Sequence, residues 1–271
     1  MVKKIGISNG CINKITASFV FNLLAVLKKN NKNVLLIDMT VNGTASSLYG
    51  VKNTENSFLD VFLLKKDLKD CIFETRYGDI IPSDKRMEYF YDRKDTFTKR
   101  VKWLDDFLKA VEEKYDYIYI MLPENNNNFI ATAAYMACDY VLMVSNLDNI
   151  DASKLKDLLL ELEKVDVYRK QYKKEKIELL GIVPIYGSRE FFVYFNCLDK
   201  IYENNMMELF FKTDIKSREE LFQSNINFKT ILETGGNEQA IEELEKLCVN
   251  ISDRIEAVDR ERKLPWAEKR A

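Results

Sequence analysis

The chain of 271 residues contains no histidine, and this absence removes several kinds of chemistry. Without an imidazole there is no Ser/His or Cys/His nucleophile pair, no histidine general base and no histidine metal ligand. Catalysis by this chain must therefore use carboxylates, amines, hydroxyls or a bound ligand.

Glycine is also scarce: the chain has 9 glycines, less than half of the usual share of about 7%. Loops use glycine where the backbone must adopt a positive φ or approach a ligand closely. The positions at which glycine is missing are therefore informative.

Cysteine pairs and long apolar runs are absent as well. Five cysteines are spread singly, without a C-x-x-C pair, which is typical of reduced cytosolic thiols rather than of disulfides or a zinc site. No stretch reaches the roughly 18 apolar residues of a membrane span, and the start has no apolar signal-peptide region. We expect a cytoplasmic protein with no membrane contact and no metal ligand cluster.

Charge of one sign is not in excess, since 41 basic and 43 acidic residues leave a net charge of -2. The protein as a whole therefore has no field that attracts nucleic acid or anionic lipid. Hydrophobic residues make up 46% of the chain, enough for a sizeable core in one large domain or two small ones.

Short β-type runs alternate with helical patterns along residues 1–258. This alternation predicts an α/β fold with three layers, in which a mostly parallel central sheet has helices on both faces. We expect one domain over residues 1–258 and a polar, flexible tail over residues 259–271. The expected strands are residues 4–8, 34–38, 78–82, 116–122, 140–145 and 179–185. The main expected helices, with apolar residues at 3.6-residue spacing, are 16–29, 98–114, 152–165 and 236–258.

Several segments have, in order and with similar spacing, the pattern of a known family. They are IGISN at 5–9, NVLLID at 33–38, VNGTASSLYG at 41–50, TRYGDIIPS at 75–83 and YDYIYI at 115–120. Further matches lie at 137–142 and 181–183. Together these segments resemble the ParA/MinD family of deviant Walker ATPases over nearly the whole chain. The resemblance implies a P-loop NTPase fold with a nucleotide site at the carboxyl ends of the strands.

The phosphate loop of that family resembles K-G-G-x-G-K-[ST]. Its glycines let backbone N–H groups point at phosphates, its second lysine meets the β and γ oxygens, and its hydroxyl holds magnesium. A gapless alignment through Asn9 places Cys11 at the first lysine, Thr16 at the phosphate lysine and Ala17 at the magnesium ligand. In this alignment the key groups are lost.

A shift of two residues is the alternative alignment. It places Lys14 at the phosphate lysine and recovers Gly10, but it places Ile15 at the magnesium hydroxyl. Both alignments remain open, and both remove the side-chain ligand for magnesium. The residues of this vestigial phosphate loop that are candidates for nucleotide contact are Gly10, Asn13, Lys14 and Thr16. For Lys14 a solvated surface charge is the alternative, and for Thr16 a helix cap.

The two other loops at this edge have also lost their carboxylates. Where the family has Asp-x-Asp after the second strand, this chain has Asp38-Met39-Thr40. Where the family has Asp-x-Pro and a mobile glycine loop, this chain has Met121-Leu122-Pro123, a glutamate and four asparagines. Phosphoryl transfer depends on these charges. Asp38 is the one candidate catalytic carboxylate, and a structural role in binding loop amides is its alternative.

Two groups of residues in the last third are candidates for contact with DNA or a partner. Basic residues lie where DNA-binding members of the family present them, although acidic neighbours also fit a solvated face. Aromatic residues on an expected helix cover more than one of its faces, so part of them fits a partner surface as well as a core. The basic residues are Arg189, Lys216 and Arg218, and the aromatic residues are Phe191, Phe192 and Phe195.

The resemblance and the missing groups together indicate a ParA/MinD-like partition or positioning protein of a bacterial cell. We interpret it as a pseudo-ATPase without a cofactor that acts by protein contacts in plasmid or chromosome segregation, or in localising a cell-surface machine. One alternative is an active, ATP-dependent dimerisation switch that uses Lys14 with ATP and Mg²⁺. Another is a protein that binds DNA non-specifically without nucleotide.

Overall fold

The computed structural model describes residues 2–9, 13–51, 55–63, 65–91, 101–123, 129–146, 152–185, 207–213, 215, 221, 223, 226, 228–235 and 238–264. Among them, six strands form one sheet in the order β3-β2-β4-β1-β5-β6, and all pairings between these strands are parallel. The strands are β1 (Lys3–Asn9), β2 (Val34–Asp38), β3 (Asp79–Ile81), β4 (Tyr117–Met121), β5 (Tyr140–Asn146) and β6 (Glu178–Ile185).

These strands are the six that the apolar runs predict, and each end lies within one residue of its expected position. Their sequences are nearly continuous in Val, Ile, Leu and Tyr because both faces of a parallel sheet are covered. All five residues of β2, for example, are buried. The predicted parallel α/β fold is confirmed.

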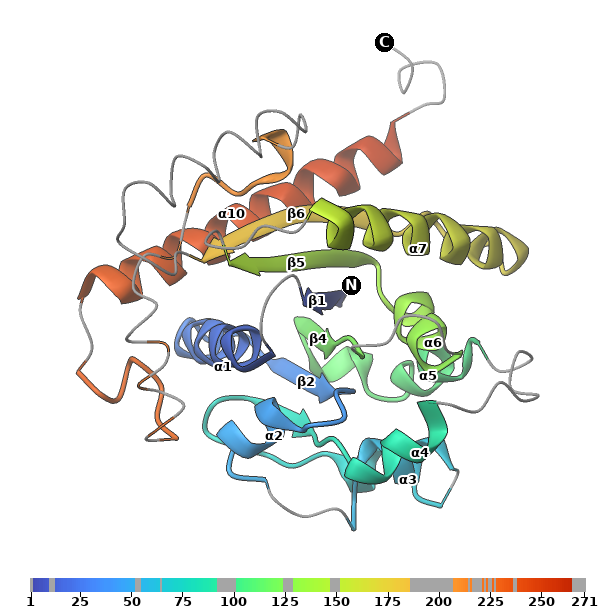
Figure 1. The fold of residues 1–271 in the computed structure, drawn as a ribbon, viewed down its shortest axis with the longest axis horizontal. Helices are drawn as coiled ribbons and strands as arrows, with labels where there is room; N and C mark the ends of the chain where they lie inside the picture. The colour runs from blue at the N-terminus through green and yellow to red at the C-terminus, as the bar shows by residue number, and fades with distance from the viewer. Residues whose placement is uncertain are drawn as a thin grey trace.

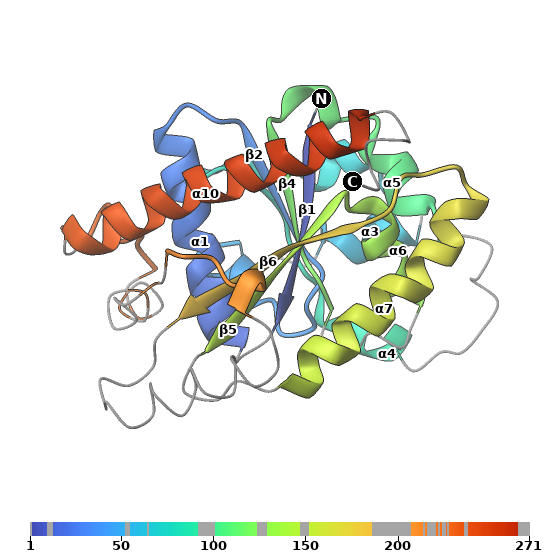
Figure 2. The ribbon, with the colours of Figure 1, turned by 90° about the horizontal axis from the view of Figure 1, so that it is seen from above.

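Helices cover both faces of the sheet, as Figures 1 and 2 show. On one face lie α1 (Asn13–Lys29) and α10 (Glu238–Lys263), and on the other lie α5 (Trp103–Leu108), α6 (Phe129–Ala137) and α7 (Ala152–Gln171). Shorter helices follow β2 and β3: α2 (Thr44–Leu48), α3 (Phe58–Phe62) and α4 (Glu88–Tyr91). Single turns of 3-10 helix occupy Leu68–Cys71, Lys85–Met87, Glu112–Lys114 and Met207–Leu209.

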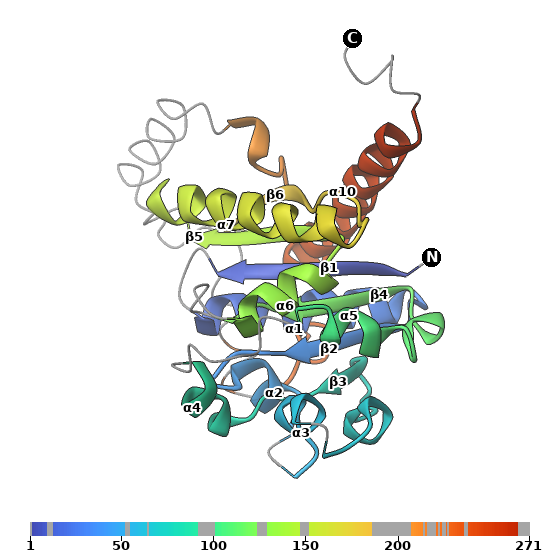
Figure 3. The same ribbon diagram turned by 90° about the vertical axis from the view of Figure 1, so that its right-hand side faces the viewer.

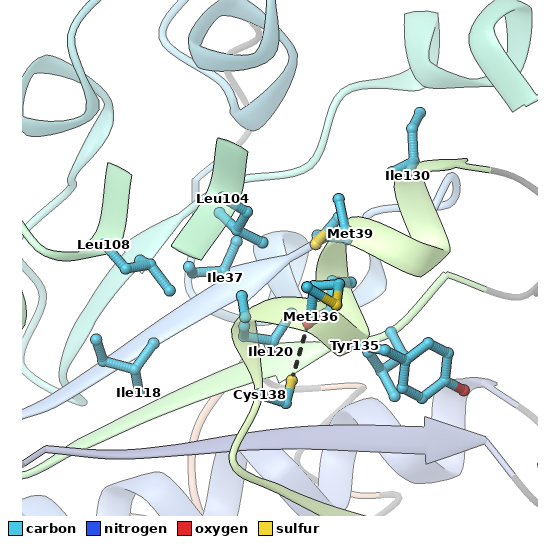
Figure 4. Packing of buried hydrophobic residues seen from close by; sticks show 14 of the residues in the cluster. Ile37, Met39, Leu104, Leu108, Ile118, Ile120, Ile130, Tyr135, Met136 and Cys138 are labelled. Atoms are coloured by element: carbon cyan, nitrogen blue, oxygen red, sulfur yellow. Dashed lines mark hydrogen bonds between the residues drawn. The ribbon is translucent and has the colours of Figure 1, made fainter. Parts of the chain in front are cut away.

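Each face of the sheet has its own hydrophobic core. Figure 4 shows part of the core on the α5 and α6 side, where Ile37 and Met39 meet Leu104 and Met136. In the same core the Cys138 thiol donates a hydrogen bond to a carbonyl one turn earlier in the chain. The two cores explain why the strands are apolar on both faces.

The thiols that the structure describes are free, namely those of Cys71, Cys138 and Cys248. Burial raises their pKa values, to about 11 for Cys71 and to about 12 for Cys138 and Cys248. These cysteines are therefore protonated, unreactive core residues near neutral pH. No helix in the described part of the chain combines the length and the apolar character needed to cross a bilayer.

The expected helix over residues 98–114 is only partly present. Residues 101–102 form a turn, α5 covers Trp103–Leu108, and a separate 3-10 turn covers Glu112–Lys114. Residues 92–100 lie outside the described residues. Periodicity alone did not locate the break after Leu108, because Leu104, Leu108 and Val111 are buried with the spacing of one continuous helix.

The sequence predicts a polar tail from residue 259, but in the structure α10 continues to Lys263. The start of the predicted tail is corrected accordingly. Two side chains anchor this extra turn. Asp259 accepts hydrogen bonds from Lys3 and Tyr140, and Arg262 donates to the carbonyls of Asp139 at 3.3 Å and Lys176 at 2.7 Å. The charges that made these residues look like a solvated tail are the groups that bind them to the sheet. Residues 265–271 lie outside the described residues.

Arg169 on α7 is a long charged side chain that is 2% exposed. It donates to the carbonyls of Met136 at 3.2 Å and Cys138 at 2.6 Å, which lie at the end of α6, and Lys174 donates to the Met136 carbonyl at 2.8 Å. Carbonyls at a helix end lack partners within the helix. The helix α7 therefore continues to Gln171, six residues beyond its predicted end, and places Arg169 where it binds these carbonyls.

A second buried ion network lies at the amino ends of the strands. Asp105 on α5 is 4% exposed. Its Oδ1 lies 3.3 Å from Nζ of Lys4 on β1 and 2.7 Å from Nζ of Lys174. Burial raises the pKa of Asp105, but the hydrogen bonds and charges of Lys174 and Lys4 outweigh burial and hold this pKa below its usual value.

At the other side of the sheet, Gly181 lets an arginine reach the edge strand. A bulge shifts the register of β5 and β6, and Gly181 has a φ of +142°. Arg254 of α10 donates past it to the carbonyls of Leu180, Leu209 at 3.2 Å and Phe210 at 2.7 Å. The sequence pattern gave no sign of this contact, because it joins residues more than seventy positions apart.

We expect Gly181→Ala to lower the free energy of unfolding by more than about 3 kcal/mol. An added Cβ would lie 2.0 Å from Nη1 of Arg254 and 2.4 Å from the Leu209 carbonyl oxygen. Gly50→Ala is the matched control, because Gly50 also has a positive φ but has no atom within 4 Å of the added Cβ. Its cost should be about 1 kcal/mol. Urea denaturation measures both, and equal costs would contradict the assigned contact.

We expect Asp105→Asn to destabilise the protein by about 3 kcal/mol at pH 7, because it leaves Lys4 and Lys174 without their shared partner. The folded pKa of Asp105 lies below the ordinary 3.8. Its ionised form therefore stabilises the fold above that value, and this contribution is lost as the pH falls through the folded pKa. Urea titrations between pH 7 and pH 3 should show a weaker acid dependence for Asp105→Asn than for the parent. The exposed Asp157→Asn should behave like the parent.

Candidate functional site

The candidate site lies at the carboxyl ends of β1, β2 and β4, where the arrowheads in Figure 3 point to the same side. The connections from β1 and β4 leave in opposite directions, α1 on one face of the sheet and α6 on the other. In open α/β sheets such a switch point is the usual position of a ligand. The polar residues at this edge are therefore the candidates for ligand contact.

The start of α1 distinguishes the two phosphate-loop alignments. In the gapless alignment Ile15, Thr16 and Ala17 would occupy phosphate-binding positions, but all three are inside α1 and are at most 2% exposed. In the shifted alignment Lys14 lies in the first turn of α1 and is exposed. A P-loop has its lysine at the start of the helix, so the helix boundary favours the shifted alignment.

Thr16 does not cap α1, because the helix begins at Asn13 and Thr16 is its fourth residue, with no exposed surface. The predicted start at residue 16 was wrong because the first turn contains Asn13 and Lys14, whose polarity resembles that of a loop. The side chain of Asn13 and all of Gly10 lie outside the described residues. Lys14 is therefore the one candidate of this loop whose side chain is described and accessible.

Asn9 ends β1 directly before this loop. Both polar atoms of its side chain are buried and have no hydrogen-bond partner in the part of the chain that the structure describes. A buried polar group without a partner costs about 1–3 kcal/mol, so such an amide is a natural place for a ligand or an ordered water. Asn9 and Lys14 lie at the two ends of the predicted phosphate loop.

Asp38, the one retained candidate carboxylate, is completely buried. Its Oδ1 accepts hydrogen bonds from the backbone N–H of Thr40 at 3.1 Å and from its hydroxyl at 2.6 Å. Its Oδ2 accepts from the backbone N–H of Ser46 at 2.9 Å and from its hydroxyl at 2.7 Å. Asp38 therefore binds the loop amides of Thr40 and Ser46, as its structural alternative requires.

The hydrogen bonds continue to the end of β3. The Ser46 hydroxyl oxygen accepts from the backbone N–H of Ser83 at 2.9 Å, and the Ser83 hydroxyl donates to the Thr40 carbonyl. Sequence reasoning missed these three hydroxyl residues. The Asp38-x-Thr40 pattern of an Asx turn could have indicated Thr40, whereas Ser46 reaches Asp38, and Ser83 reaches Ser46 and Thr40, only through the fold.

The positions of the two lost carboxylates are both buried. Thr40 is 2% exposed and donates its hydroxyl to Asp38, and Met121 is 1% exposed at the end of β4. Met39, which lies between Asp38 and Thr40, packs into the core of Figure 4. Among the described residues no group of three or more Cys, Asp or Glu side chains comes together to hold a metal. With Ile15 aligned at the position of the magnesium hydroxyl, the side chains described at this edge do not form a magnesium site.

The predicted surfaces for DNA or a partner are not described by the structure. Arg189, Lys216 and Arg218 lie outside the described residues, as do Phe191, Phe192 and Phe195. Their roles stay predictions.

Comparisons with known proteins agree on the fold. A family model described as an AAA domain matches residues 2–178, more than half of the chain. A search of curated protein sequences found no match. Solved structures with a similar fold include apo McdA of Cyanothece, with a TM-score of 0.74 and 16% identity over 94% of this chain and 100% of that chain.

Two further structures extend the comparison. A Borrelia burgdorferi B31 protein described as a plasmid partition protein, bound to AMPPNP, has a TM-score of 0.73 and 20% identity over 94% of this chain and 98% of that one. The cell division ATPase MinD of Pyrococcus furiosus has a TM-score of 0.68 and 18% identity over 95% and 100% of the two chains. The chain therefore belongs to the AAA domain family, and its fold is that of the ParA/MinD-type P-loop ATPases.

Proposed function

We propose that this chain is a partition or positioning protein of the ParA/MinD type that acts through protein contacts and does not hydrolyse ATP. Its task is the segregation of a plasmid or chromosome, or the localisation of a cell-surface machine. The names of structural neighbours support this class of task, since one is described as a plasmid partition protein and another as a cell division ATPase.

The saturation of Asp38 is the observation that supports the absence of hydrolysis most directly. A carboxylate that positions an attacking water or a metal needs free lone pairs at the reacting phosphate. All strong acceptor sites of Asp38 are used by Thr40 and Ser46. With no second carboxylate at positions 40 and 121, the described residues of this edge offer no group that is free to activate water.

We propose further that a nucleotide phosphate still contacts this edge, without a divalent cation. This proposal replaces the expectation that no cofactor binds. It is supported by the exposed Lys14 in the first turn of α1, by the amide of Asn9, which has no partner among the described residues, and by the N-terminus of a helix of 17 residues. Backbone N–H groups and the dipole at a helix N-terminus favour an anion.

The partner of this protein is proposed to be another protein. Homodimer formation also remains a proposal. We place the partner contact in the last third of the chain, where the aromatic and basic candidates at residues 189–218 are found. This placement rests on the sequence alone.

ATP at millimolar concentration should raise the melting temperature by several degrees, because a ligand that binds the folded state stabilises it by mass action. The rise should be equal in Mg²⁺ and in EDTA, and no phosphate should be released. Lys14→Ala should abolish the rise without changing the melting temperature in buffer. Lys28→Ala, an exposed lysine near the other end of α1, is the matched control and should keep the full rise.

The outcomes separate the proposals. Phosphate release that Asp38→Ala or Lys14→Ala abolishes would identify an active ATPase switch and overturn the pseudo-ATPase. A melting temperature that ATP leaves unmoved would overturn the phosphate contact alone. Retardation of duplex DNA without nucleotide, lost steeply as salt rises, would favour the DNA-binding alternative.

A further inference from the structure

Three hydroxyl residues from three segments form a hydrogen-bonded group at the Asp38 carboxylate: Thr40 and Ser46 donate to it, and Ser83 bonds to both of them. Thr40 follows β2, Ser46 belongs to α2 and Ser83 follows β3; they are 2%, 4% and 8% exposed. We call Thr40, Ser46 and Ser83 the hydroxyl clamp. The clamp lies at the edge of the sheet where nucleotide-dependent proteins of this fold have their site, so its rigidity bears on how the chain responds to ligands.

The hydrogen bonds of the clamp leave no acceptor site of Asp38 free. An ionised carboxylate has about four acceptor sites, and Asp38 receives four donors at 2.6–3.1 Å. The Ser46 oxygen is used again by the Ser83 N–H at 2.9 Å. A cation could therefore reach Asp38 only after at least one of these bonds breaks. The donor released would be left buried without a partner, which is costly.

Apolar packing holds the same segment from the other side. In α2, Ala45 has no exposed surface and Leu48 is 3% exposed, and both belong to the core beneath α1. Tyr49, which follows α2, meets the ring of Phe21 on α1 edge to face with the ring centroids 5.2 Å apart. Movement of α2 away from β2 would break these contacts together with the hydrogen bonds.

We propose that the hydroxyl clamp holds residues 38–46 in one conformation that neither a divalent cation nor a nucleotide changes. A ligand can shift a conformation only if it binds one state better than another. Here the second state would expose a buried carboxylate and several donors. The segment after the second strand is thus a fixed platform, and any response to ligand arises elsewhere. This inference goes beyond the proposed function, because it holds whether or not ATP binds or is hydrolysed.

Amide hydrogen exchange, read residue by residue by NMR, tests the clamp. In the parent, the amides of Thr40 and Ser46 should exchange at least about a hundredfold more slowly than their unstructured rates. Addition of Mg²⁺ and ATP slows every amide that exchanges through global unfolding if the nucleotide binds, so the rates are compared with those of buried amides in β1. Relative to these reference amides, Thr40 and Ser46 should change by no more than about twofold. The double variant Thr40→Val/Ser46→Ala removes both hydroxyl donors. In this variant the backbone amide of residue 46 should exchange at least about tenfold faster than in the parent.

Ser47→Ala is the matched control, because the Ser47 hydroxyl donates to the Gly43 carbonyl within the same helix and does not contact Asp38. It should leave the exchange of Thr40 and Ser46 unchanged. If the double variant does not fold, Ser46→Ala alone should still accelerate the Thr40 amide relative to Ser47→Ala.

Three results would overturn the clamp: unprotected Thr40 and Ser46 amides in the parent, equal rates in the clamp and control variants, or a change above about twofold relative to the β1 amides on adding Mg²⁺ and ATP. ATP hydrolysis together with unchanged amides would instead overturn the pseudo-ATPase and leave the clamp standing. Absence of hydrolysis together with ligand-dependent exchange of the Thr40 and Ser46 amides would overturn the clamp and leave the pseudo-ATPase proposal standing.

Discussion

The buried carboxylate of Asp38 sets the arrangement of the carboxyl edge of the sheet. A charge without solvent is very costly unless it is fully hydrogen-bonded, and the donors that satisfy it come from residues two and eight positions later. The chain therefore turns back tightly after β2, and α2 begins with its N-terminus against the carboxylate. Through Ser46 the same bonds fix the end of β3. One group thus joins two strands and a helix.

Charged groups also hold the amino ends of the strands, but there buried cations take part as well as a buried carboxylate. Lys4 and Lys174 share Asp105, and Arg169 satisfies the end of α6. Both edges of the sheet are consequently rigid for the same reason, since each ion or carbonyl in a poorly solvated position needs its particular partner. What differs is the consequence. At the carboxyl edge, the bonds that give rigidity occupy all four acceptor positions of the Asp38 carboxylate.

Most of the fold could be predicted from the sequence, because the core strands and long helices leave a periodic apolar pattern. Boundaries were less certain where polar residues are buried. The start of α1 at Asn13, the end of α7 near Arg169 and the end of α10 beyond Asp259 all depend on polar side chains whose partners are far away in the chain. Of the candidate site, the loss of magnesium ligands was predictable by position. The hydroxyl partners of Asp38 were not.

The sequence by itself determined which groups the chain has for chemistry. It has no histidine and few glycines, it has Ile15 in place of the magnesium hydroxyl, and Asp38 is the one carboxylate kept from the family pattern. The tertiary structure alone decided what those groups do. It placed Lys14 on the surface and Thr16 in the core, left the Asn9 amide without a partner among the described residues and surrounded Asp38 with donors. The physical reason is that a side chain's type gives its chemistry, whereas burial and distant partners decide whether a ligand can reach it.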